Sequence, residues 1–200
     1  MPVVGLTGGI ATGKSAFARL LLQHLPAAFF DADACSRELL RGDPQVIASI
    51  REKFGPAIIA ADGGVIRSRL RDLVFADAGQ RRLLESVLHP PIRASWTALS
   101  VEARQAGTWL LVDIPLLYET QAESQCDGVI VVACSDVIQL GRLQTERALP
   151  LELAKRIVAA QLPLAIKVHK ADHLIWNDST ISCLGAQAEL IAGALQHRYA

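Results

Sequence analysis

The stretch that decides the fold is Gly8-Gly-Ile-Ala-Thr-Gly-Lys-Ser15. It matches the pattern G-x-x-x-x-G-K-[ST], in which glycines let the backbone wrap closely around phosphate groups. An apolar run at residues 3–7 precedes it, and apolar residues at helical spacing follow it up to residue 25. Strand, glycine turn and helix form the context that this pattern requires. The stretch therefore predicts a loop that binds the phosphates of a nucleoside triphosphate.

Each residue type in this loop has a physical reason. Successive N–H groups and the positive end of the following helix attract phosphate charge. We expect Lys14 to reach the β- and γ-phosphates and the Ser15 hydroxyl to ligate Mg²⁺. A dinucleotide site is a worse fit, because no G-x-G-x-x-G occurs. The expected ATP contacts are Gly9, Ala11, Thr12, Gly13, Lys14, Ser15 and Ala16.

The order of elements along the chain indicates a doubly wound α/β fold. Further strands are expected at residues 28–30, 108–113 and 128–133, with a weaker one at 171–176. Helices are expected at residues 36–40, 151–161, from Ser135 to about residue 147, and in a final segment ending near residue 197. The pattern predicts a mostly parallel five-stranded sheet in a single domain, residues 1–200. Its ligands should lie beyond the carboxyl ends of the strands.

Residues 44–107 read as helical, with breaks expected at 55–56, 61–64 and 89–91. A helical block of this length between two strands of one sheet suggests an insertion. We therefore expect a helical substrate-binding subdomain at about residues 35–107 and a lid at about residues 143–170. In the lid or beside it, Arg147, Lys167 and Lys170 are candidates to close over the triphosphate and exclude water, although each is more often a solvated charge.

Composition excludes several classes of protein. The 200 residues are 51% apolar and 20% charged, which is typical of a compact globular protein. The formal net charge is zero, so no general basic field attracts nucleic acid or an anionic membrane. No apolar run approaches the roughly 20 residues of a membrane span, and the four cysteines are scattered. We expect a cytoplasmic protein with reduced cysteines.

Acidic residues follow two of the expected strands. Asp31 and Asp33 would lie on one side of an extended chain, where a carboxylate can orient an incoming hydroxyl, although either could instead cap the next helix. Asp113 ends the third strand, where phosphate-loop enzymes place an acid near Mg²⁺, unless it is a structural residue of the core edge. The N-K-x-D motif of Ras-type GTPases is missing beside Asn177, which argues against a guanine-specific switch.

Several motifs together resemble the dephospho-coenzyme A kinase family. Besides the phosphate loop with Leu6 and Thr7, they are Asp31-Ala-Asp33, Leu88-His-Pro90, Asp113-Ile-Pro-Leu-Leu-Tyr-Glu119, and Ala171-Asp172 with Asn177. The resemblance implies transfer of the γ-phosphate of ATP to the 3′-hydroxyl of the ribose of dephospho-coenzyme A, the last step of coenzyme A synthesis. It also implies a phosphate-loop kinase fold with a helical substrate domain and a lid. The sequence departs from the common pattern at Ala11, where glycine is usual, and at Ala16, where threonine is frequent.

The resemblance also implies roles for single residues. Asp33 corresponds to the family's catalytic carboxylate, and Thr7 to its active-site threonine. Arg142 corresponds to the arginine that contacts the transferring phosphate; we expect Val137, Leu140 and Leu143 to face inward and leave it on another face. The remaining residues implied are His89, Asp113 and Leu117 for substrate, and Asn177 for ATP.

Two other hypotheses remain open at this stage. A nucleoside or nucleotide kinase of similar build would need a base pocket instead of an apolar groove for the pantetheine arm within residues 44–107. Loss of the catalytic carboxylate or of the lid cations would favour a binding module that senses ATP without turnover, and neither is lost. Whether the chain is a monomer or a small homo-oligomer is left open by the sequence.

Overall fold

A computed structural model describes residues 1–199, apart from the side chains at positions 75 and 76. The chain divides into two compact units. The first comprises Met1–Phe30 and Ser100–Ala200, and the second is Asp31–Leu99. The first carries the sheet and the second is helical.

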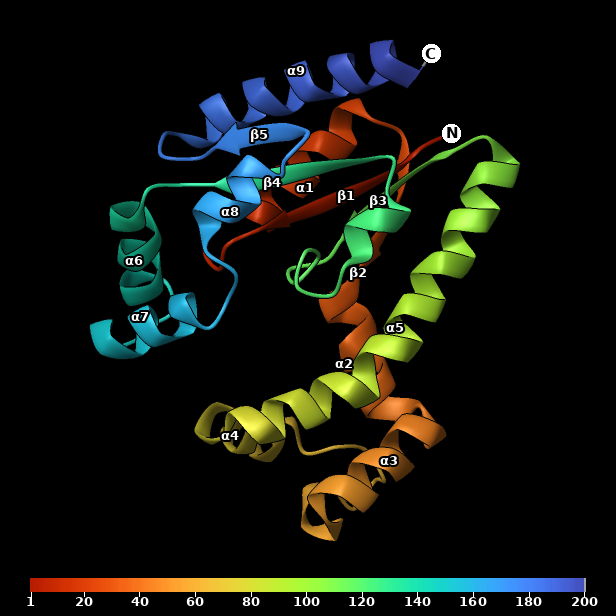
Figure 1. The fold of residues 1–200 in the computed structure, drawn as a ribbon, viewed down its shortest axis with the longest axis vertical. Helices are drawn as coiled ribbons and strands as arrows, with labels where there is room; N and C mark the ends of the chain where they lie inside the picture. The colour runs from red at the N-terminus through yellow and green to blue at the C-terminus, as the bar shows by residue number, and fades with distance from the viewer. Residues whose placement is uncertain (200) are drawn as a thin grey trace. The chain divides into compact units, whose positions relative to one another are not determined.

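The sheet of the first unit has five strands in the order β2-β3-β1-β4-β5 (Figure 1). The strands are β1 (Val3–Gly8), β2 (Ala27–Asp31), β3 (Trp109–Asp113), β4 (Gly128–Ala133) and β5 (His173–Trp176). The expected strands are thus confirmed within a few residues. The fold class is confirmed as well: the sheet is parallel, and helices cover it.

The register brings the carboxyl ends of the central strands together. Leu6 pairs with Asp113 of β3, and Gly8 pairs with Val132 of β4. The last residues of β1 and β3 therefore lie at the same edge of the sheet. Ligands of open α/β sheets bind at this edge.

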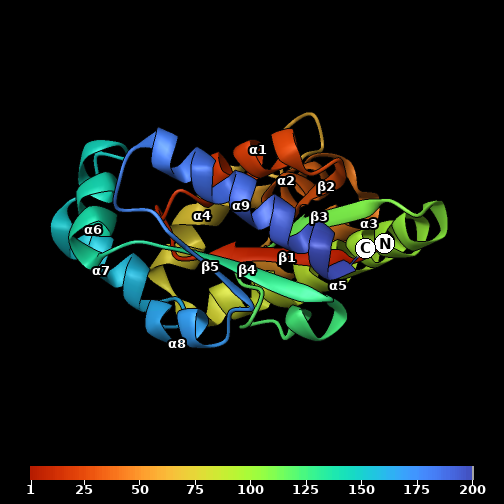
Figure 2. The ribbon, with the colours of Figure 1, turned by 90° about the horizontal axis from the view of Figure 1, so that it is seen from above.

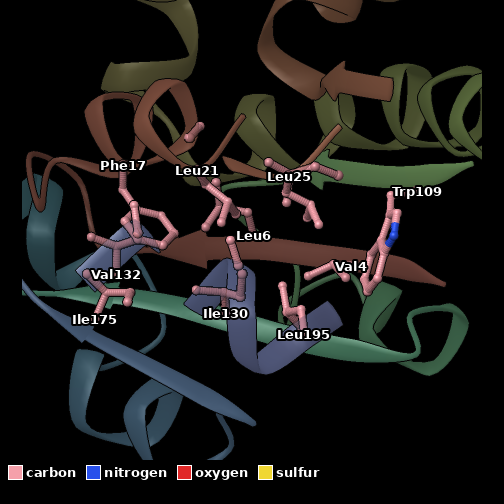
Figure 3. Close-up of a cluster of buried hydrophobic side chains, with 14 of the residues drawn as sticks. Val4, Leu6, Phe17, Leu21, Leu25, Trp109, Ile130, Val132, Ile175 and Leu195 are labelled. Carbon is pink, nitrogen blue, oxygen red and sulfur yellow. The ribbon is translucent and has the colours of Figure 1, made fainter. Parts of the chain in front are cut away.

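One face of the sheet carries the main hydrophobic core. Alternate residues of a strand point to one face, so Val4 and Leu6 of β1 share it with Ile130 and Val132 of β4. Figure 3 shows these side chains meeting Phe17, Leu21 and Leu25. The helices α1 (Lys14–His24) and α9 (Ile181–Tyr199) supply that cover. Figure 2 shows both on the same side of β1.

The opposite face is covered by segments that follow β3 and β4. After β3 comes an irregular stretch with the short helix η2 (Ala122–Gln125), and Leu117 of this stretch is fully buried. After β4 the chain forms α6 (Asp136–Thr145), α7 (Leu151–Ala159) and α8 (Leu164–His169). Figure 2 shows α8 on the side of β1 opposite to α9. Ser135 caps α6, as expected: its side chain accepts a hydrogen bond from the N–H of Ile138.

The second unit has a core of its own. It contains α2 (Ala32–Gly42), α3 (Pro44–Phe54), η1 (Pro56–Ile58), α4 (Arg67–Ala76) and the start of α5 (Ala78–Ala106). Its buried residues come from all of these segments and from the loop before α4, which supplies Val65. The others are Leu40, Val46, Ile50, Ile58, Leu70 and Leu88. The expected breaks at residues 55–56 and 61–64 are confirmed.

The expected break at residues 89–91 is wrong, because α5 runs through Pro90 and Pro91. Proline lacks an N–H, so each removes one hydrogen bond from the helix. Leu84, Leu88 and Ile92 on this stretch all pack into the core of the second unit. Their burial holds the helix on both sides of the prolines, so packing overrides the local signal.

Within residues 1–199, no helix is both long enough and apolar enough to span a membrane.

Candidate active site

The phosphate loop joins β1 to α1 with its glycines at points of close approach. A Cβ atom at Gly8 would collide with the carbonyl oxygen of Val132, and one at Gly13 would collide with the side-chain amide of Asn177. Gly13 is left-handed, with φ of 91°, and no side chain caps the helix that follows. The first N–H groups of α1 are therefore available to an anion.

The carbonyl groups of the loop are held from outside. The oxygen of Gly9 accepts from the Thr12 hydroxyl at 2.9 Å. Four other side chains each donate to one further carbonyl: Lys167 to Gly8, Gln139 to Ile10, Arg142 to Ala11, and Asn177 to Thr12. Because these carbonyls are bound, the N–H groups are the part of the loop backbone that can bind phosphate oxygens. Those of Ile10 and Thr12 already donate to Gln161 and to the carbonyl of Gly9.

Lys14, the first residue of α1, forms an ion pair with Asp113 at the end of β3. Both side chains are largely buried, with 13% and 6% exposed respectively. Asp113 reaches the loop because the parallel register sets it beside Leu6, two residues before Gly8. The structure thus brings together the loop lysine and an acidic residue that the sequence placed at a strand end.

Two hard oxygen donors for a metal, Ser15 and Asp113, lie beside the loop. Ser15 is exposed on the first turn of α1, and Asp113 lies at the end of β3. Within residues 1–199, no three His, Cys, Asp or Glu side chains gather as a metal cluster. Mg²⁺ usually takes only one or two protein oxygens and completes its shell with water and phosphate, so Ser15 and Asp113 suit it.

Arg142 and Asn177 brace the loop from α6 and from the end of β5. The guanidinium group of Arg142 donates to Asn177 O at 3.0 Å and to Ala11 O at 3.4 Å. Asn177 is buried, and its amide donates to Thr12 O at 2.8 Å. The expected inward face of α6 is partly wrong: Val137 is 80% exposed, whereas Gln139 is buried in its place.

Thr7 and Leu117 lie deeper than a ligand-contacting role would suggest. The Thr7 hydroxyl is buried and donates to the carbonyl of Pro115 at 3.1 Å. Leu117 is fully buried and packs against Gly5 in the middle of β1. In this structure both side chains pack against β1 and offer no surface to a ligand.

The three lid cations have different surroundings. Arg147 is exposed, and Lys170 is exposed with its ammonium 2.9 Å from Glu123 and 4.5 Å from the Tyr118 ring centroid. Lys167 is instead fully buried. Its ammonium lies 2.9 Å from Glu119 and donates to Pro115 O at 3.0 Å and to Gly8 O at 3.4 Å. Lys167 therefore supports the loop by binding the carbonyl of Gly8, a role that the sequence did not predict.

In the second unit, Asp31 ends β2 but Asp33 is already in α2, so the two carboxylates do not share one side of an extended chain as expected. Asp31 caps α2, accepting from the N–H of Ala34 at 2.8 Å, while Asp33 is exposed on the first turn of that helix. Within the described residues, the Asp33 carboxylate has no hydrogen bond or ion pair. His89 lies inside α5 and not at a helix start; burial lowers its pKa, and nearby Glu85 opposes that shift.

Sequence reasoning missed three polar residues that shape the loop. Gln139 donates to Ile10 O, Gln161 accepts from Ile10 N–H, and Glu119 holds both Lys167 and the N–H of Leu162. Glu119 stood at the end of a quoted motif, which was a usable signal. The two glutamines carried none, because a neutral amide in a helical segment has the same appearance as a surface residue.

Comparison with known proteins gives this geometry a family. The family model for dephospho-CoA kinase matches residues 2–182. The chain belongs to the dephospho-CoA kinase family. That family catalyses the final step of coenzyme A synthesis with ATP, so this enzyme transfers the γ-phosphate of ATP to the 3′-hydroxyl of dephospho-CoA.

Curated relatives agree with the assignment, and solved structures share the fold. A dephospho-CoA kinase of Symbiobacterium thermophilum is 38% identical over 190 residues, covering 94% of this chain and 79% of the relative. One from Albidiferax ferrireducens is 36% identical over 94% of this chain and 90% of its own. The solved dephospho-CoA kinase of Campylobacter jejuni has a TM-score of 0.74 at 24% identity, covering 99% and 98% of the two chains. The shikimate kinase of Acinetobacter baumannii, with a TM-score of 0.56 at 15% identity, shares the fold alone.

Proposed function

We propose that the family reaction runs on the loop from Gly8 to Ser15, with Lys14 as the cation that neutralises the transferring phosphate. The observation that carries this proposal is the arrangement of the loop, whose carbonyls are bound from outside. Its N–H groups and the uncapped start of α1 then serve the triphosphate. The proposed ATP contacts are Gly9, Ala11, Thr12, Gly13, Lys14, Ser15, Ala16 and Asn177.

Lys14 would exchange one anionic partner for another. In the structure it pairs with Asp113, which keeps its ammonium group at the loop. When ATP binds, the β- and γ-phosphate oxygens offer more negative charge than one carboxylate. Lys14 would then turn from the Asp113 carboxylate to the phosphates.

Mg²⁺ is the proposed metal, held by Ser15, with Asp113 close to the ion or its water shell. Its chemistry is neutralisation of charge on the phosphate oxygens. The Ser15 hydroxyl and the Asp113 carboxylate are hard oxygen donors at neighbouring strand and helix ends, which supports this assignment.

Asp33 is the proposed carboxylate that aligns the 3′-hydroxyl of dephospho-CoA and accepts its proton. Its exposure and lack of a partner support this role, because a carboxylate already engaged in a cap would not be available. Asp31 is engaged in such a cap, so it would hold the helix while Asp33 acts on the substrate.

The other family residues keep their proposed roles. Arg142 would stabilise the charge spread over the equatorial phosphate oxygens, for which a planar cation is suited. It would exchange its carbonyl contacts for phosphate on ATP binding. Thr7 would act through the loop end, and His89, Asp113 and Leu117 would shape the substrate site. Arg147 and Lys170 remain candidates for closing over the triphosphate.

The test is ADP release from ATP with dephospho-CoA, AMP or several nucleosides as acceptor. Lys14→Ala should lower kcat about 10²- to 10³-fold, as loss of a charge-stabilising donor does. Asp33→Asn should lower kcat about 10²- to 10⁴-fold, the usual contribution of a general base. Asp31→Asn is the matched control: asparagine still caps the helix, so kcat should be unchanged.

Each result bears on a separate statement. No turnover with dephospho-CoA would overturn the substrate. Full activity in Asp33→Asn would overturn only the role of that residue, and equal losses in Asp31→Asn and Asp33→Asn would mean that both act through the helix.

We also propose a cytoplasmic enzyme that acts without nucleic acid or a membrane, supported by its zero formal net charge. Size-exclusion chromatography with light scattering would decide between a monomer and a small homo-oligomer.

A further inference from the structure

Both hydrogen-bonding groups of Ile10, in the middle of the phosphate loop, are bound by glutamine side chains. The N–H of Ile10 donates to Gln161 Oε1 at 2.9 Å. Its carbonyl accepts from Gln139 Nε2 at 2.8 Å. Within the described residues, no other residue of the loop has both its N–H and its carbonyl bound by side chains.

Gln139 fits its place closely. The residue is 2% exposed, and glutamine is rarely buried to this extent. Buried polar side chains normally have hydrogen-bond partners, as Gln139 has in the carbonyl of Ile10. A Cβ atom added to Gly9 would lie 2.7 Å from its Nε2 atom. Glycine at position 9 therefore admits the amide, and the amide in turn supports the loop next to that glycine.

The two glutamines lie near opposite ends of residues 136–161, which contain the helices α6 and α7 and are called the α6–α7 segment below. Gln139 is on the second turn of α6, and Gln161 follows the last residues of α7. Beyond Gln161, the N–H of Leu162 donates to Glu119 at 3.0 Å. The α6–α7 segment is thus attached to the loop where it begins and where it ends.

This attachment also bears on Arg142. Residues three apart on a helix share a face, so Gln139 and Arg142 approach the loop together. Gln139 binds Ile10 and Arg142 binds Ala11, the next residue along the loop. If the loop shifted relative to α6, Arg142 would no longer be aligned with phosphates bound in the loop.

We propose that Gln139 and Gln161 are positioning residues for phosphoryl transfer, which hold Ile10 from both sides and set the α6–α7 segment in register with the phosphate loop. The proposal rests on the role given above to the loop as the triphosphate site. It predicts that ATP binding depends on both amides, whereas dephospho-CoA binding does not.

A different role for Gln161 predicts the opposite sign. If its carboxamide oxygen occupies an N–H group that a phosphate must bind, the two acceptors compete. Removing the amide would then tighten ATP binding. The direction of the change in KM for ATP therefore separates positioning from competition.

The experiment compares Gln139→Met, Gln161→Met and the double variant with wild type. Methionine keeps the size of the side chain and removes the hydrogen bond. Each single variant should raise KM for ATP about five- to tenfold, the usual effect of one lost hydrogen bond, with KM for dephospho-CoA unchanged. Since both amides act on one residue, the double variant should raise KM by less than the product of the two single effects.

The matched control is Gln196→Met. Gln196 is exposed and donates to the carbonyl of His24 at 3.4 Å, at the far end of α1 from the loop. It should leave both KM values unchanged. Thermal unfolding of every variant distinguishes a local effect from a loss of fold, and if Gln139→Met does not fold, Gln161→Met decides by the same criteria.

An unchanged or lowered KM for ATP in Gln161→Met would overturn the proposal. So would an equal rise in both KM values, which indicates general damage. Wild-type turnover with dephospho-CoA is measured in the same assay, so failure of the proposed function would show there, independently of the variants.

Discussion

The buried Lys167 offers the sharpest test of what holds the phosphate loop. Its side chain is 0% exposed, and its ammonium group contacts Glu119 at 2.9 Å and two backbone carbonyls, those of Pro115 and Gly8. Lys167→Met removes the charge and keeps the length of the side chain. We expect the variant to unfold more easily and to bind ATP more weakly.

The magnitude follows from burial. Breaking a buried ion pair by removing one partner costs about 3 to 5 kcal/mol. Glu119 is 22% exposed and can regain some hydration, so the lower end, about 3 kcal/mol, applies. For a chain of this length that loss corresponds to a Tm lowered by roughly 6 to 12 °C.

Urea unfolding at equilibrium measures the effect, with thermal unfolding as a second readout. Lys155→Met is the matched control, because Lys155 pairs with Glu152 at 3.0 Å but both side chains are exposed. It should cost no more than about 0.5 kcal/mol. A loss below about 1 kcal/mol for Lys167→Met would refute the reasoning, since it would mean that the ammonium group is not tied to the loop and to Glu119 as described.

Three further predictions concern backbone strain, thiols and pH. Ala11 is left-handed at φ of 58°, so Ala11→Gly should relieve about 1 kcal/mol of strain, partly offset by unfolded-state entropy; lower stability in urea would contradict this. A hydrogen bond from Ser179 lowers the pKa of the exposed Cys183, while burial raises that of Cys126 to about 12, so a thiol reagent should modify Cys183 first. A fast phase that persists in Cys183→Ser would refute that order. Burial lowers the pKa of His173 below 6.5; the unfolded chain then binds more protons, so the free energy of unfolding should fall as pH drops below 6.5. His173→Gln should flatten this dependence in urea titrations on either side of pH 6.5, and an unchanged slope would argue against it.

Much of the fold was predictable because it depends on local signals. Buried parallel strands are continuously apolar, as in β4, and helix starts carry caps such as Ser135. The failure at Pro90 and Pro91 has the opposite cause. The helix continues through the two prolines because Leu88 and Ile92 are packed into the core of the second unit. That packing cannot be predicted from the residues around the prolines.

The phosphate loop itself was determined by the sequence alone. The roles proposed for its glycines, Lys14 and Ser15 depend on backbone geometry and charge within a few residues, so their order is enough to predict what the loop binds. The position of Asp113 beside the loop could also be predicted, because the end of a parallel strand can be located from the sequence.

What surrounds the loop was decided only by the tertiary structure. Gln139, Gln161 and Lys167 are far from the loop in sequence, and they meet it because the chain after β4 folds back over the strand ends. Their amide and ammonium groups have no pattern in sequence, since the value of a buried donor depends on the one carbonyl it finds. For this protein, the residues proposed to contact phosphate can be identified along the chain, whereas the residues that hold them in place can be identified only in the tertiary structure.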